Sequence, residues 1–577
     1  MLLKSILEEV IQATKITYGV EPEKQLLLEV PPNPDFGDFA ISTFLLKKQL
    51  GKNPNIIAKE IVENISTDGI IQKAEACGPY INVTLGTDFF QEACSDVAPI
   101  NKNGKRIMVE YLSPNTNKPL HLGHFRNGVI GMSVSNMLEY MGNTVVKTNL
   151  INDRGIHICK SMVAWQKFAN GLTPDITGIK GDHFVGNYYV LFSKESEKDS
   201  SLMEEAQIML KKWEDGDSEV IELWKTMNDW VYAGFSDTYK KTGFQFDTCL
   251  YESNTYKLGK NIVDQGMENG IFKKLDSGET VFELPEKSFG KDKDGSRKKV
   301  TMLREDGTSV YITQDIGTAL EKATNYNLDA SIYVVGSEQD YHFKCLFEIL
   351  QALGYKWFDK YHHLSYGMVE LPNGKMKSRE GTSVDADDLI VKMKELAEKE
   401  IRGRDIIGEL SNEEITTRAE KIGLGAIKFY LAKTVPKQKM LFNPEESISF
   451  EGATGPYCQY AYARICSVTE KKPKNWEDTP HIKYELLGSN TQERILAQKI
   501  VLFENKISKA TEDLNPAIIA NSVYDLAKAF SQWYNSYQII DQNNSELSKA
   551  RLELACSTAK IIKKALGLLG IEILTKM

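Results

Sequence analysis

The sequence lacks most features that mark secreted or membrane-bound proteins. Its eight cysteines are scattered and form no C-x-x-C pair, which argues against a zinc ribbon or a disulfide framework and favours reduced thiols. No eighteen apolar residues run together, so no membrane span is expected. The N-terminus has no basic start followed by an unbroken apolar core, so it does not resemble a signal peptide. These absences predict a cytoplasmic protein.

Excess positive charge is also missing. The formal net charge is −9, which is the wrong sign for a protein that binds a polyanion with its whole surface. A large enzyme touches RNA over only part of its surface, so local clusters such as Lys560, Lys563 and Lys564 matter more than the total. A solvated helix face explains that cluster equally well.

The chain has no internal repeat and no low-complexity linker, and 577 residues are too many for one hydrophobic core. Shifts in its hydrophobic pattern predict a multidomain α/β protein. The predicted parts are a small α+β N-terminal domain (1–98), the first half of a Rossmann-type parallel-sheet catalytic domain (99–170), an insertion (171–300), the second half of the catalytic domain (301–390), a connecting helical segment (391–440) and an all-α C-terminal bundle (441–577).

One βαβ pattern indicates the catalytic domain. Arg106–Leu112 and Thr144–Ile151 have the apolar, β-branched composition of strands. Between them, apolar residues recur at helical spacing from Gly123 to Met141, and Gly142 follows as a stop. Such a unit opens a doubly wound nucleotide-binding sheet. Further predicted elements are strands at 310–313 and 330–335 and helices at 416–432, 493–510, 517–535 and 549–569.

The junction between the first strand and its helix contains His121, Gly123 and His124 in the spacing H-x-G-H. A helix N-terminus offers unpaired N–H groups and partial positive charge to a triphosphate. Imidazoles there can donate to phosphate oxygens as charge moves to the leaving pyrophosphate, and Gly123 leaves room for adenine beside the backbone. The alternative is a pair of structural histidines in a turn. With eight His and 41 Gly, about 0.008 chance matches are expected, which favours function.

A second motif, Gly-Lys-Met-Lys-Ser-Arg-Glu-Gly-Thr-Ser, occupies residues 374–383. Alone it indicates no more than a solvated basic turn. A basic loop that folds over a triphosphate would supply charge at the moment of transfer. Because it follows the H-x-G-H motif and the last predicted strands, it is similar to the KMSKS loop. The two motifs together are typical of class I aminoacyl-tRNA synthetases and related nucleotidylyltransferases.

Three further segments should meet in one crevice, because doubly wound sheets bind ligands at the carboxyl ends of their strands. The first carries Glu110, the second carries Tyr311 and Asp315, and the third spans 336–342. Two carboxylates and an aromatic wall suit a planar guanidinium, which prefers bidentate acceptors and stacking. Taken singly, Asp315 as a helix cap and Glu110 as a surface strand residue are equally good explanations.

Several segments resemble arginyl-tRNA synthetases specifically. They are EYLSPNTNKPLHLGHFRN, SVYITQDIG, YVVGSEQDYHFKCLFEIL, GKMKSREGTSV, SFEGATGPYCQYAYARI and the terminal LLGIEILTKM. The resemblance covers essentially the whole chain and is thin only in the predicted insertion. It implies ATP-dependent activation of L-arginine and its transfer to tRNA(Arg), with an N-terminal domain that binds the tRNA elbow and a C-terminal domain that binds the anticodon. It also implies that activation waits for bound tRNA.

The resemblance assigns roles to individual residues. For arginine binding the matching positions are Glu110, Ser113, Asn115, Tyr311, Asp315 and Gln339. For ATP they are His121, Gly123, His124, His342, Met368, Lys375, Met376 and Ser378, and the catalytic set is His121, His124, Lys118, Lys375 and Lys377. For tRNA they are Tyr80, Asn82, Tyr457, Tyr460, Arg464, Tyr534, Tyr537 and Met577. We expect Mg²⁺ to arrive on the ATP phosphates, no zinc and no metal cage of protein side chains, and a monomer.

Some points stay open at this stage. The fourth residue of the KMSKS pattern is Ser378 instead of lysine, and the family often carries a lysine just before the first histidine, which Lys118 matches. Which lysine meets the phosphates is undecided. A buried strand tyrosine explains Tyr80 equally well, and Phe530 and Trp533 are expected in the core. A small-molecule ligase lacks a use for the long helical C-terminus, and intact motif residues argue against an inactive RNA-binding scaffold.

Overall fold

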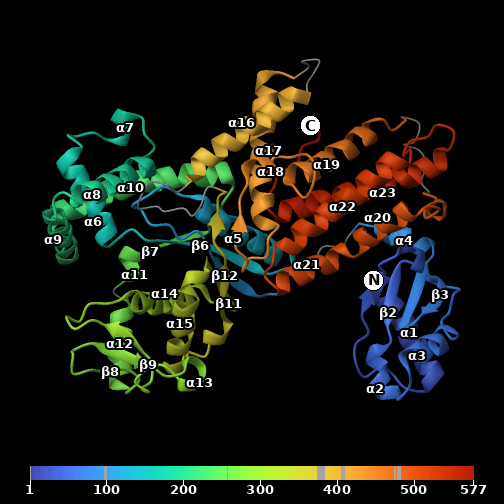
Figure 1. The fold of residues 1–577 in the computed structure, drawn as a ribbon, viewed down its shortest axis with the longest axis horizontal. Helices are drawn as coiled ribbons and strands as arrows, with labels where there is room; N and C mark the ends of the chain where they lie inside the picture. Colours follow the sequence, from blue (N-terminus) through green and yellow to red (C-terminus); the bar gives the residue numbers. More distant parts are fainter. Residues whose placement is uncertain are drawn as a thin grey trace.

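The computed structural model describes residues 2–96, 100–256, 258–372, 384–404, 410–473, 476 and 482–577. Figure 1 shows the catalytic domain at the centre and left, the C-terminal helices at the right, and the N-terminal domain beneath those helices. The central sheet is parallel, the C-terminal region is helical and a small α+β domain precedes both. The predicted fold class is therefore confirmed.

The central sheet has five parallel strands among the described residues, in the order β12-β11-β5-β6-β7. These strands are β5 (Arg106–Glu110), β6 (Thr144–Ile151), β7 (Thr248–Tyr251), β11 (Ala330–Gly336) and β12 (Tyr361–Tyr366). The chain proceeds from β5 to β6 on one side, while β11 pairs with β5 on the other side. The topological switch point therefore lies between β5 and β11, where open α/β sheets bind ligands.

Helix α5 (Leu122–Tyr140) follows β5 and is buried along most of its length. Its close packing on the sheet depends on Gly131, since a Cβ there would lie 2.3 Å from the Tyr111 ring. The predicted stop is also present, because Gly142 has a φ of +84° just beyond the helix. The α5 N-terminus is thereby fixed at the switch point.

A group of helices then lies between β6 and β7, at the upper left of Figure 1. They are α6 (Ile156–Phe168), α7 (Pro174–Thr177), α8 (Gly181–Ser196), α9 (Ser201–Asp215) and α10 (Ser218–Thr242). The sequence analysis identified no strand within the predicted insertion from 171 to 300, whereas β7 is the edge strand of the central sheet. Strand β7 has only four residues and lies between the long helix α10 and the short helix α11 (Glu252–Thr255). So short a run gives too weak a pattern for detection from sequence.

A smaller antiparallel sheet and its helices occupy the lower left of Figure 1. It consists of β8 (Lys273–Lys274), β9 (Thr280–Glu283) and β10 (Lys299–Leu303), with α12 (Leu258–Glu268), α13 (Glu286–Phe289), α14 (Tyr311–Tyr326) and α15 (Asp340–Ala352). The predicted strand at 310–313 is wrong, because α14 begins at Tyr311. Its β-branched start imitates a strand, yet Ile312, Ile316 and Ala319 are buried at helical spacing.

The N-terminal domain combines four helices with one antiparallel sheet. The sheet order is β1-β2-β4-β3, and its elements are α1 (Leu2–Tyr18), β1 (Leu28–Glu29), β2 (Phe39–Ser42), α2 (Lys47–Leu50), α3 (Pro54–Val62), β3 (Ile71–Cys77), β4 (Tyr80–Leu85) and α4 (Thr87–Cys94). The small α+β fold expected for this part of the chain is therefore present.

The C-terminal half of the chain is mainly helical. Its elements are the short β13 (Val369–Glu370), α16 (Ala386–Arg404), α17 (Asn412–Ala432), β14 (Met440–Leu441), α18 (Pro444–Ser447), α19 (Gly455–Glu470), α20 (Thr491–Val501), α21 (Phe503–Glu512), α22 (Ala517–Ser536) and α23 (Ser545–Leu568). The predicted helix at 493–510 is two helices, which meet at Leu502. Phe530 and Trp533 are fully buried, as predicted.

Polar contacts fix the C-terminal helices to both other regions. Arg494 pairs with the buried Asp38 of the N-terminal domain at 2.8 Å. Lys564 contacts Glu504 and the Tyr140 hydroxyl of α5, each at 2.8 Å, and Lys560 pairs with Asp96 at 2.7 Å. Two of the three clustered lysines therefore join parts of the protein, and Lys560 and Lys563 are exposed.

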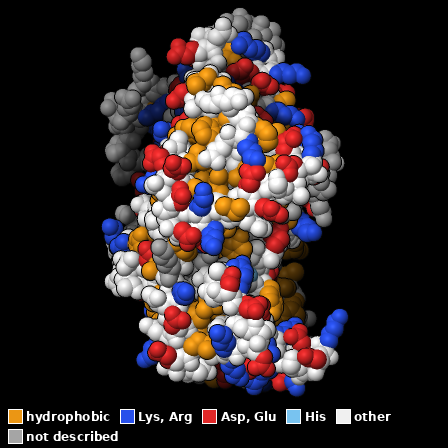
Figure 2. Space-filling view, turned by 90° about the vertical axis from the view of Figure 1, so that its left-hand side faces the viewer, with side chains coloured by type: hydrophobic (Ala, Val, Ile, Leu, Met, Phe, Trp, Pro, Cys, Tyr) orange, Lys and Arg blue, Asp and Glu red, His pale blue; other side chains and the backbone are white. Residues whose placement is uncertain are grey.

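The face seen in Figure 2 carries basic and acidic side chains interspersed, with apolar side chains between them. Exposed apolar residues near α7 include Leu172, Ile176 and Ile179. No broad patch of one charge sign is visible on this face, which agrees with the balanced composition of the chain.

Candidate active site

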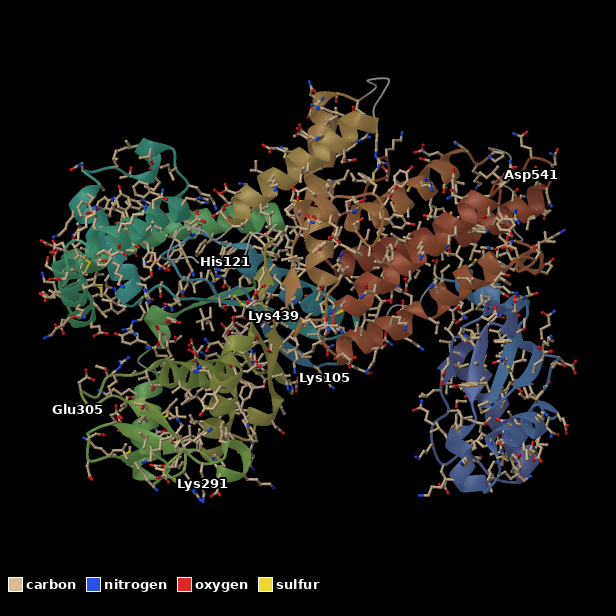
Figure 3. The ribbon with its side chains drawn as sticks, in the orientation of Figure 1. Lys105, His121, Lys291, Glu305, Lys439 and Asp541 are labelled. Carbon is tan, nitrogen blue, oxygen red and sulfur yellow. The ribbon has the colours of Figure 1, made fainter. Side chains whose placement is uncertain are left out.

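The candidate site lies at the carboxyl ends of β5, β6, β7 and β11. Figure 3 shows His121 near the centre of the molecule, where the helices after β6 come close to the central sheet. The chain leaves β5 in an unusual conformation, because Leu112 and Ser113 have φ values of +72° and +47°. Two buried amides hold this turn. Asn127 accepts from the Leu112 N–H at 2.6 Å, and Asn149 accepts from the Ser113 N–H at 3.1 Å. Strain held in this way is typical of ligand sites.

The segment after this turn has buried polar atoms without protein partners. They are Ser113 Oγ, Thr116 Oγ1 and Asn117 Oδ1, together with Asn152 Oδ1 on the neighbouring segment. Asn115 forms an isolated parallel bridge with Asn152. Buried polar groups normally have partners, so a cluster of unpaired ones indicates a place for a polar ligand.

His121 and His124 cap the N-terminus of α5 reciprocally. The Nδ1 atom of His121 accepts from the N–H groups of Gly123 at 3.1 Å and His124 at 3.4 Å. The Nδ1 atom of His124 accepts from the His121 N–H at 3.2 Å, and the two rings stack with their centroids 3.8 Å apart. Since each Nδ1 acts as an acceptor, the proton of each neutral ring lies on Nε2. Each ring therefore retains one N–H for a ligand.

The two histidines are neutral. Burial, with a smaller contribution from Lys118, lowers the pKa of His121 to about 3. Burial, with smaller contributions from the neighbouring His121 and Lys118, holds the pKa of His124 well below its usual range. Burial also lowers the pKa of Lys118 itself. Lys118 thus supplies a partly buried cation beside two neutral N–H donors, which suits a triphosphate.

The second sequence motif lies outside the described residues. The motif contains four predicted site residues, which therefore lie outside the described part of the chain: Lys375, Met376, Lys377 and Ser378. The residues that follow it, 384–386, are described. They run antiparallel to residues 120–122, which we call the histidine segment. The Leu122 N–H donates to Val384 O at 3.1 Å, and the Ala386 N–H donates to Leu120 O at 2.9 Å.

Met368 lies where the sequence leads into this second motif, and its side chain is exposed. The buried guanidinium of Arg126, two residues after His124, holds the backbone there. It donates to Gly367 O at 2.6 Å, to Gln438 O at 2.9 Å and to Pro436 O at 3.2 Å. Met368 is thereby fixed relative to the α5 N-terminus, as a residue that contacts bound adenine would need to be.

The predicted arginine ligands come from separate elements. Tyr311 and Asp315 lie one turn apart on α14, and Tyr311 is 65% exposed. The Asp315 carboxylate lies 2.6 Å from His342 Nε2, which links a predicted arginine ligand to a predicted ATP ligand. Gln339 is exposed at the start of α15.

Glu110 differs from the other predicted ligands. Its carboxylate is buried and accepts a hydrogen bond from the equally buried Lys322, which also lies over the Tyr333 ring. Lys322 already pairs with Oε2 of Glu110, so a ligand guanidinium would share this carboxylate with an internal cation. The direct contact between Glu110 and arginine stays a prediction, and the ion pair with Lys322 gives Glu110 a structural role as well.

The sequence did not indicate Glu252, which follows β7 directly. Burial and the charges of Asp315 and Asp153 raise its pKa to about 8. The neighbouring Ser253 is fixed by the buried Asp153, which accepts from the Ser253 N–H at 2.9 Å and its hydroxyl at 2.7 Å. Detecting β7 would have located Glu252, because polar residues at the ends of parallel strands point to the ligand crevice.

Among the described residues, only Asp182, His183 and Asp387 come close enough together to hold a metal ion with three ligands. Lys180 lies 3.1 Å from Asp182 and 2.6 Å from Asp387, so an ammonium group already occupies that place. These side chains do not fit a catalytic metal.

Comparison with known proteins covers the whole chain. A family model described as tRNA synthetases class I (R), catalytic domain, matches residues 92–439. A DALR anticodon binding domain matches 458–577, and an arginyl tRNA synthetase N terminal domain matches 1–85. The chain belongs to the arginyl-tRNA synthetases.

Relatives of this synthetase agree over full length. The chain is 42% identical to an arginine–tRNA ligase of Bacteroides thetaiotaomicron, with 99% of both chains covered. It is 43% identical to an arginine–tRNA ligase of Flavobacterium psychrophilum, over 91% of this chain and 89% of the relative. The fold is similar to that of a Thermus thermophilus arginyl-tRNA synthetase, with a TM-score of 0.80, 24% identity and complete coverage of both chains. No described helix of the synthetase is long and apolar enough to span a membrane.

The predicted tRNA ligands of the synthetase's N-terminal domain differ in accessibility. Tyr80 is partly exposed, and its ring meets the exposed Phe44 edge-on at 6.5 Å. Asn82 is only 6% exposed, so its amide is not accessible to a base in this structure. It sits in the central strand β4 with neighbours on both sides, and the short sequence pattern could not show this.

The predicted anticodon ligands gather mainly on two packed helices. Arg464 of α19 lies over the rings of Tyr460 and Tyr534, 4.6 and 4.9 Å from their centroids. Tyr457 lies on α19 too, and its ring is 5.6 Å from that of Tyr524. Tyr537 follows α22, with Arg551 over its ring at 5.5 Å, and Met577 packs partly buried at the chain end. All five predicted aromatic and arginine side chains remain partly exposed.

Proposed function

We propose that this chain activates L-arginine with ATP to arginyl-adenylate and transfers the arginyl group to tRNA(Arg), releasing AMP and pyrophosphate. The observation that carries the proposal is a site at the carboxyl ends of the parallel strands whose two ends differ in charge. Neutral His121 and His124 with free Nε2–H groups lie beside Lys118 at one end, and Asp315 and Glu252 lie at the other. The first end suits a triphosphate, and the second suits a guanidinium.

In the first step an oxygen of the arginine carboxylate attacks the α-phosphorus of ATP, and the bond to the β-phosphate oxygen breaks. Pyrophosphate leaves with the electron pair. His121 and His124 donate their Nε2–H groups to phosphate oxygens, and Lys118 places its ammonium beside the same charge. No protein nucleophile is needed, because positioning and charge stabilisation suffice. Mg²⁺ enters on the ATP phosphates.

The arginine side chain is held between Tyr311 and the carboxylates of Asp315 and Glu252. Asp315 and Tyr311 come from one face of α14, so the tyrosine ring can cover a guanidinium that the carboxylate binds. The unpaired polar atoms of Ser113 and the neighbouring segment would receive the amino acid's ammonium and carboxylate. Asn115 and Gln339 would also contact arginine. The buried ion pair between Glu110 and Lys322 would support these ligands.

ATP is held along the other wall. Gly123 leaves room for the His121 ring, since a Cβ there would lie 2.9 Å from His121 Cε1. Met368 would lie against the adenine, and His342 would reach the ribose from its position beside Asp315. Lys375, Met376, Lys377 and Ser378 would approach the phosphates from the segment that ends at Val384, next to the histidines.

In the second step a hydroxyl of the terminal tRNA ribose attacks the adenylate carbonyl, and AMP leaves. Tyr457, Tyr460, Arg464, Tyr534, Tyr537 and Met577 would receive unstacked anticodon bases, for which aromatic and guanidinium faces are suitable. Tyr80 would contact the tRNA elbow. We place this reaction in the cytoplasm and assign it to the monomer.

Pyrophosphate exchange tests the proposal. The chain is assayed with each of the twenty amino acids, with and without total tRNA. Exchange with arginine alone supports the proposal, and dependence on tRNA would show that activation waits for tRNA binding. Exchange with a different amino acid, or none under either condition, refutes it.

A further inference from the structure

Three helices from distant parts of the sequence meet at one carboxylate. Asp387 lies in the first turn of α16, and around it are the start of α8 and the C-terminal half of α10. Lys180 donates to Asp387 at 2.6 Å, and the buried Thr238 of α10 donates to it at 3.1 Å. Lys180 also donates to the Thr238 hydroxyl at 2.6 Å. The three side chains form a closed triangle.

Further charged groups from all three helices lie close to these three side chains. From α8, Asp182 lies 3.1 Å from Lys180, and His183 lies 3.4 Å from Asp387. From α10, Lys241 approaches Asp387 at 3.6 Å, and from the start of α16, Asp385 lies 3.5 Å from His183. Burial would raise the pKa of Asp387, but hydrogen bonds from His183 and Lys180 outweigh it and hold the pKa well below its usual range.

The cluster is built into the packing. Asp182 is fully buried, and Gly234 of α10 makes room for it, since a Cβ there would lie 2.4 Å from Asp182 Oδ1. Buried charged groups are rarely the most stable filling of such a space, and removing one partner leaves another charge uncompensated. Their value lies in fixing one relative arrangement of the three helices.

That arrangement bears directly on the phosphate end of the active site. Asp385 and Ala386, just before Asp387, belong to the segment that pairs with Leu120–Leu122 through two backbone hydrogen bonds. The same helix α8 also contacts the other side of the histidine segment. A Cβ at Gly186 would lie 2.8 Å from Pro119 Cδ and 3.4 Å from Lys118 Cα. One helix therefore supports both segments that flank His121.

We propose that Asp387, held by Lys180 and Thr238, is a positioning residue for adenylate formation. It fixes the 384–386 segment against His121, while α8 fixes Lys118 through Gly186. This gives the helices between β6 and β7 a role in the chemistry that is separate from substrate contact. The inference rests on the proposed function, because it concerns the rate of that same step.

The test compares Asp387→Asn and Lys180→Met with Asp388→Asn in the full-length protein. Asp388 lies on the same helix turn and is exposed, and its substitution removes the same charge without touching α8 or α10. Misplacing a catalytic group or substrate by about 1 Å can lower the rate about 100-fold. We expect kcat for arginine-dependent pyrophosphate exchange to fall by roughly 10- to 100-fold in both cluster variants. KM for ATP and for arginine should stay within about threefold, because the substrate contacts remain. Asp388→Asn should retain normal kcat.

A double-mutant cycle separates positioning from a general loss of structure. If Lys180 and Asp387 act as one unit, the double variant loses no more kcat than either single variant, at equal folded fraction by circular dichroism. Lys180→Arg should retain most activity. Thr238→Val provides a milder variant if Asp387→Asn folds poorly, and it should lower kcat in the same direction.

Two outcomes would overturn the inference. One is normal kcat in well-folded Asp387→Asn and Thr238→Val, and the other is a loss of kcat that follows the unfolded fraction alone. Both leave the proposed function intact when the unsubstituted protein exchanges pyrophosphate with arginine. Failure of the unsubstituted protein to do so would refute the proposed function itself.

Discussion

The two ends of the proposed site would bind opposite charges, and they are built from different parts of the chain. At the phosphate end, Lys118, His121 and His124 lie within seven consecutive residues, and the helix cap they form fixes their protonation and orientation. At the guanidinium end, Asp315 and Glu252 come from elements 63 positions apart in sequence, 315 minus 252. Their surroundings include a third carboxylate, Glu110, already paired with Lys322.

This difference shows how each end obtains its charge. The proposed phosphate end combines two buried neutral donors with one cation, Lys118. The guanidinium end gathers carboxylates, and repulsion with burial keeps one of them protonated near neutral pH. One end is therefore set before substrate arrives, and the other changes protonation when arginine binds.

The largest expected effect is a loss of stability on changing Glu110. This effect would distinguish Glu110 from Asp315, which the sequence alone could not do. Glu110→Gln breaks a buried ion pair and leaves Lys322 uncompensated, which typically costs about 3–5 kcal/mol of stability. Glu139→Gln is the control, because Glu139 pairs with Lys147 at 2.9 Å on the surface, and such pairs contribute about 0–1 kcal/mol. Urea unfolding measures both. Equal stabilities of the two variants would contradict the structural role of Glu110.

Lys118→Ala should have the next largest effect, at the phosphate end. Removing one preorganised donor costs about 10²–10³ in rate, or roughly 3–4 kcal/mol. We expect kcat for adenylate formation to fall by that factor while KM for ATP changes little, because the interaction is made mainly in the transition state. Lys377→Ala should be milder, and Ser378→Lys should partly restore the Lys118→Ala activity. Exposed Lys105 provides the control variant Lys105→Ala.

The opposite order, with Lys118→Ala near normal and Lys377→Ala severely slowed, would assign the catalytic cation to the second motif. Rapid-quench measurement of adenylate formation distinguishes the two orders directly.

The same comparison explains what could be predicted from sequence. The βαβ unit, its helix stop at Gly142 and the position of the two histidines at the helix N-terminus were predictable because periodicity and motif lie in one continuous segment. The pairing of Glu110 with Lys322, 212 positions apart, left no local pattern. Glu252 was missed because β7 has only four residues, and α14 was mistaken for a strand because β-branched residues open it. Tertiary context decided each of these cases.

Asp315→Asn tests the guanidinium end, where we expect an effect of intermediate size on the use of arginine. Loss of one charge-assisted hydrogen bond is worth roughly 1.5–3 kcal/mol, or about a 10- to 150-fold fall in kcat/KM for arginine. KM for ATP should barely change, and stability should stay close to normal because Asp315 is partly exposed. Asp340→Asn, an exposed carboxylate in the first turn of α15, is the matched control. Unchanged arginine kinetics in Asp315→Asn would remove this residue from the site.

The smallest expected effect is a pH dependence confined to the guanidinium end. Burial with Asp315 and Asp153 raises the pKa of Glu252 to about 8, from an ordinary value of 4.5. Between these two values the unfolded chain is ionised there and the ligand-free fold is protonated, so stability without arginine falls as pH rises through this window. A bound guanidinium favours the ionised carboxylate, so arginine must displace the proton.

Arginine affinity should therefore rise with pH, by up to about tenfold per pH unit, until it levels near pH 8. The histidine cap does not contribute, since burial keeps His121 neutral throughout this range. Calorimetry in two buffers of different protonation enthalpy, with tRNA present if binding requires it, should show release of up to one proton per arginine at pH 7. Glu252→Gln should bind arginine more weakly and without this dependence. The same affinity at pH 6 and pH 8 in the unsubstituted protein would mean that Glu252 does not face the guanidinium, and that Asp315 alone supplies its charge.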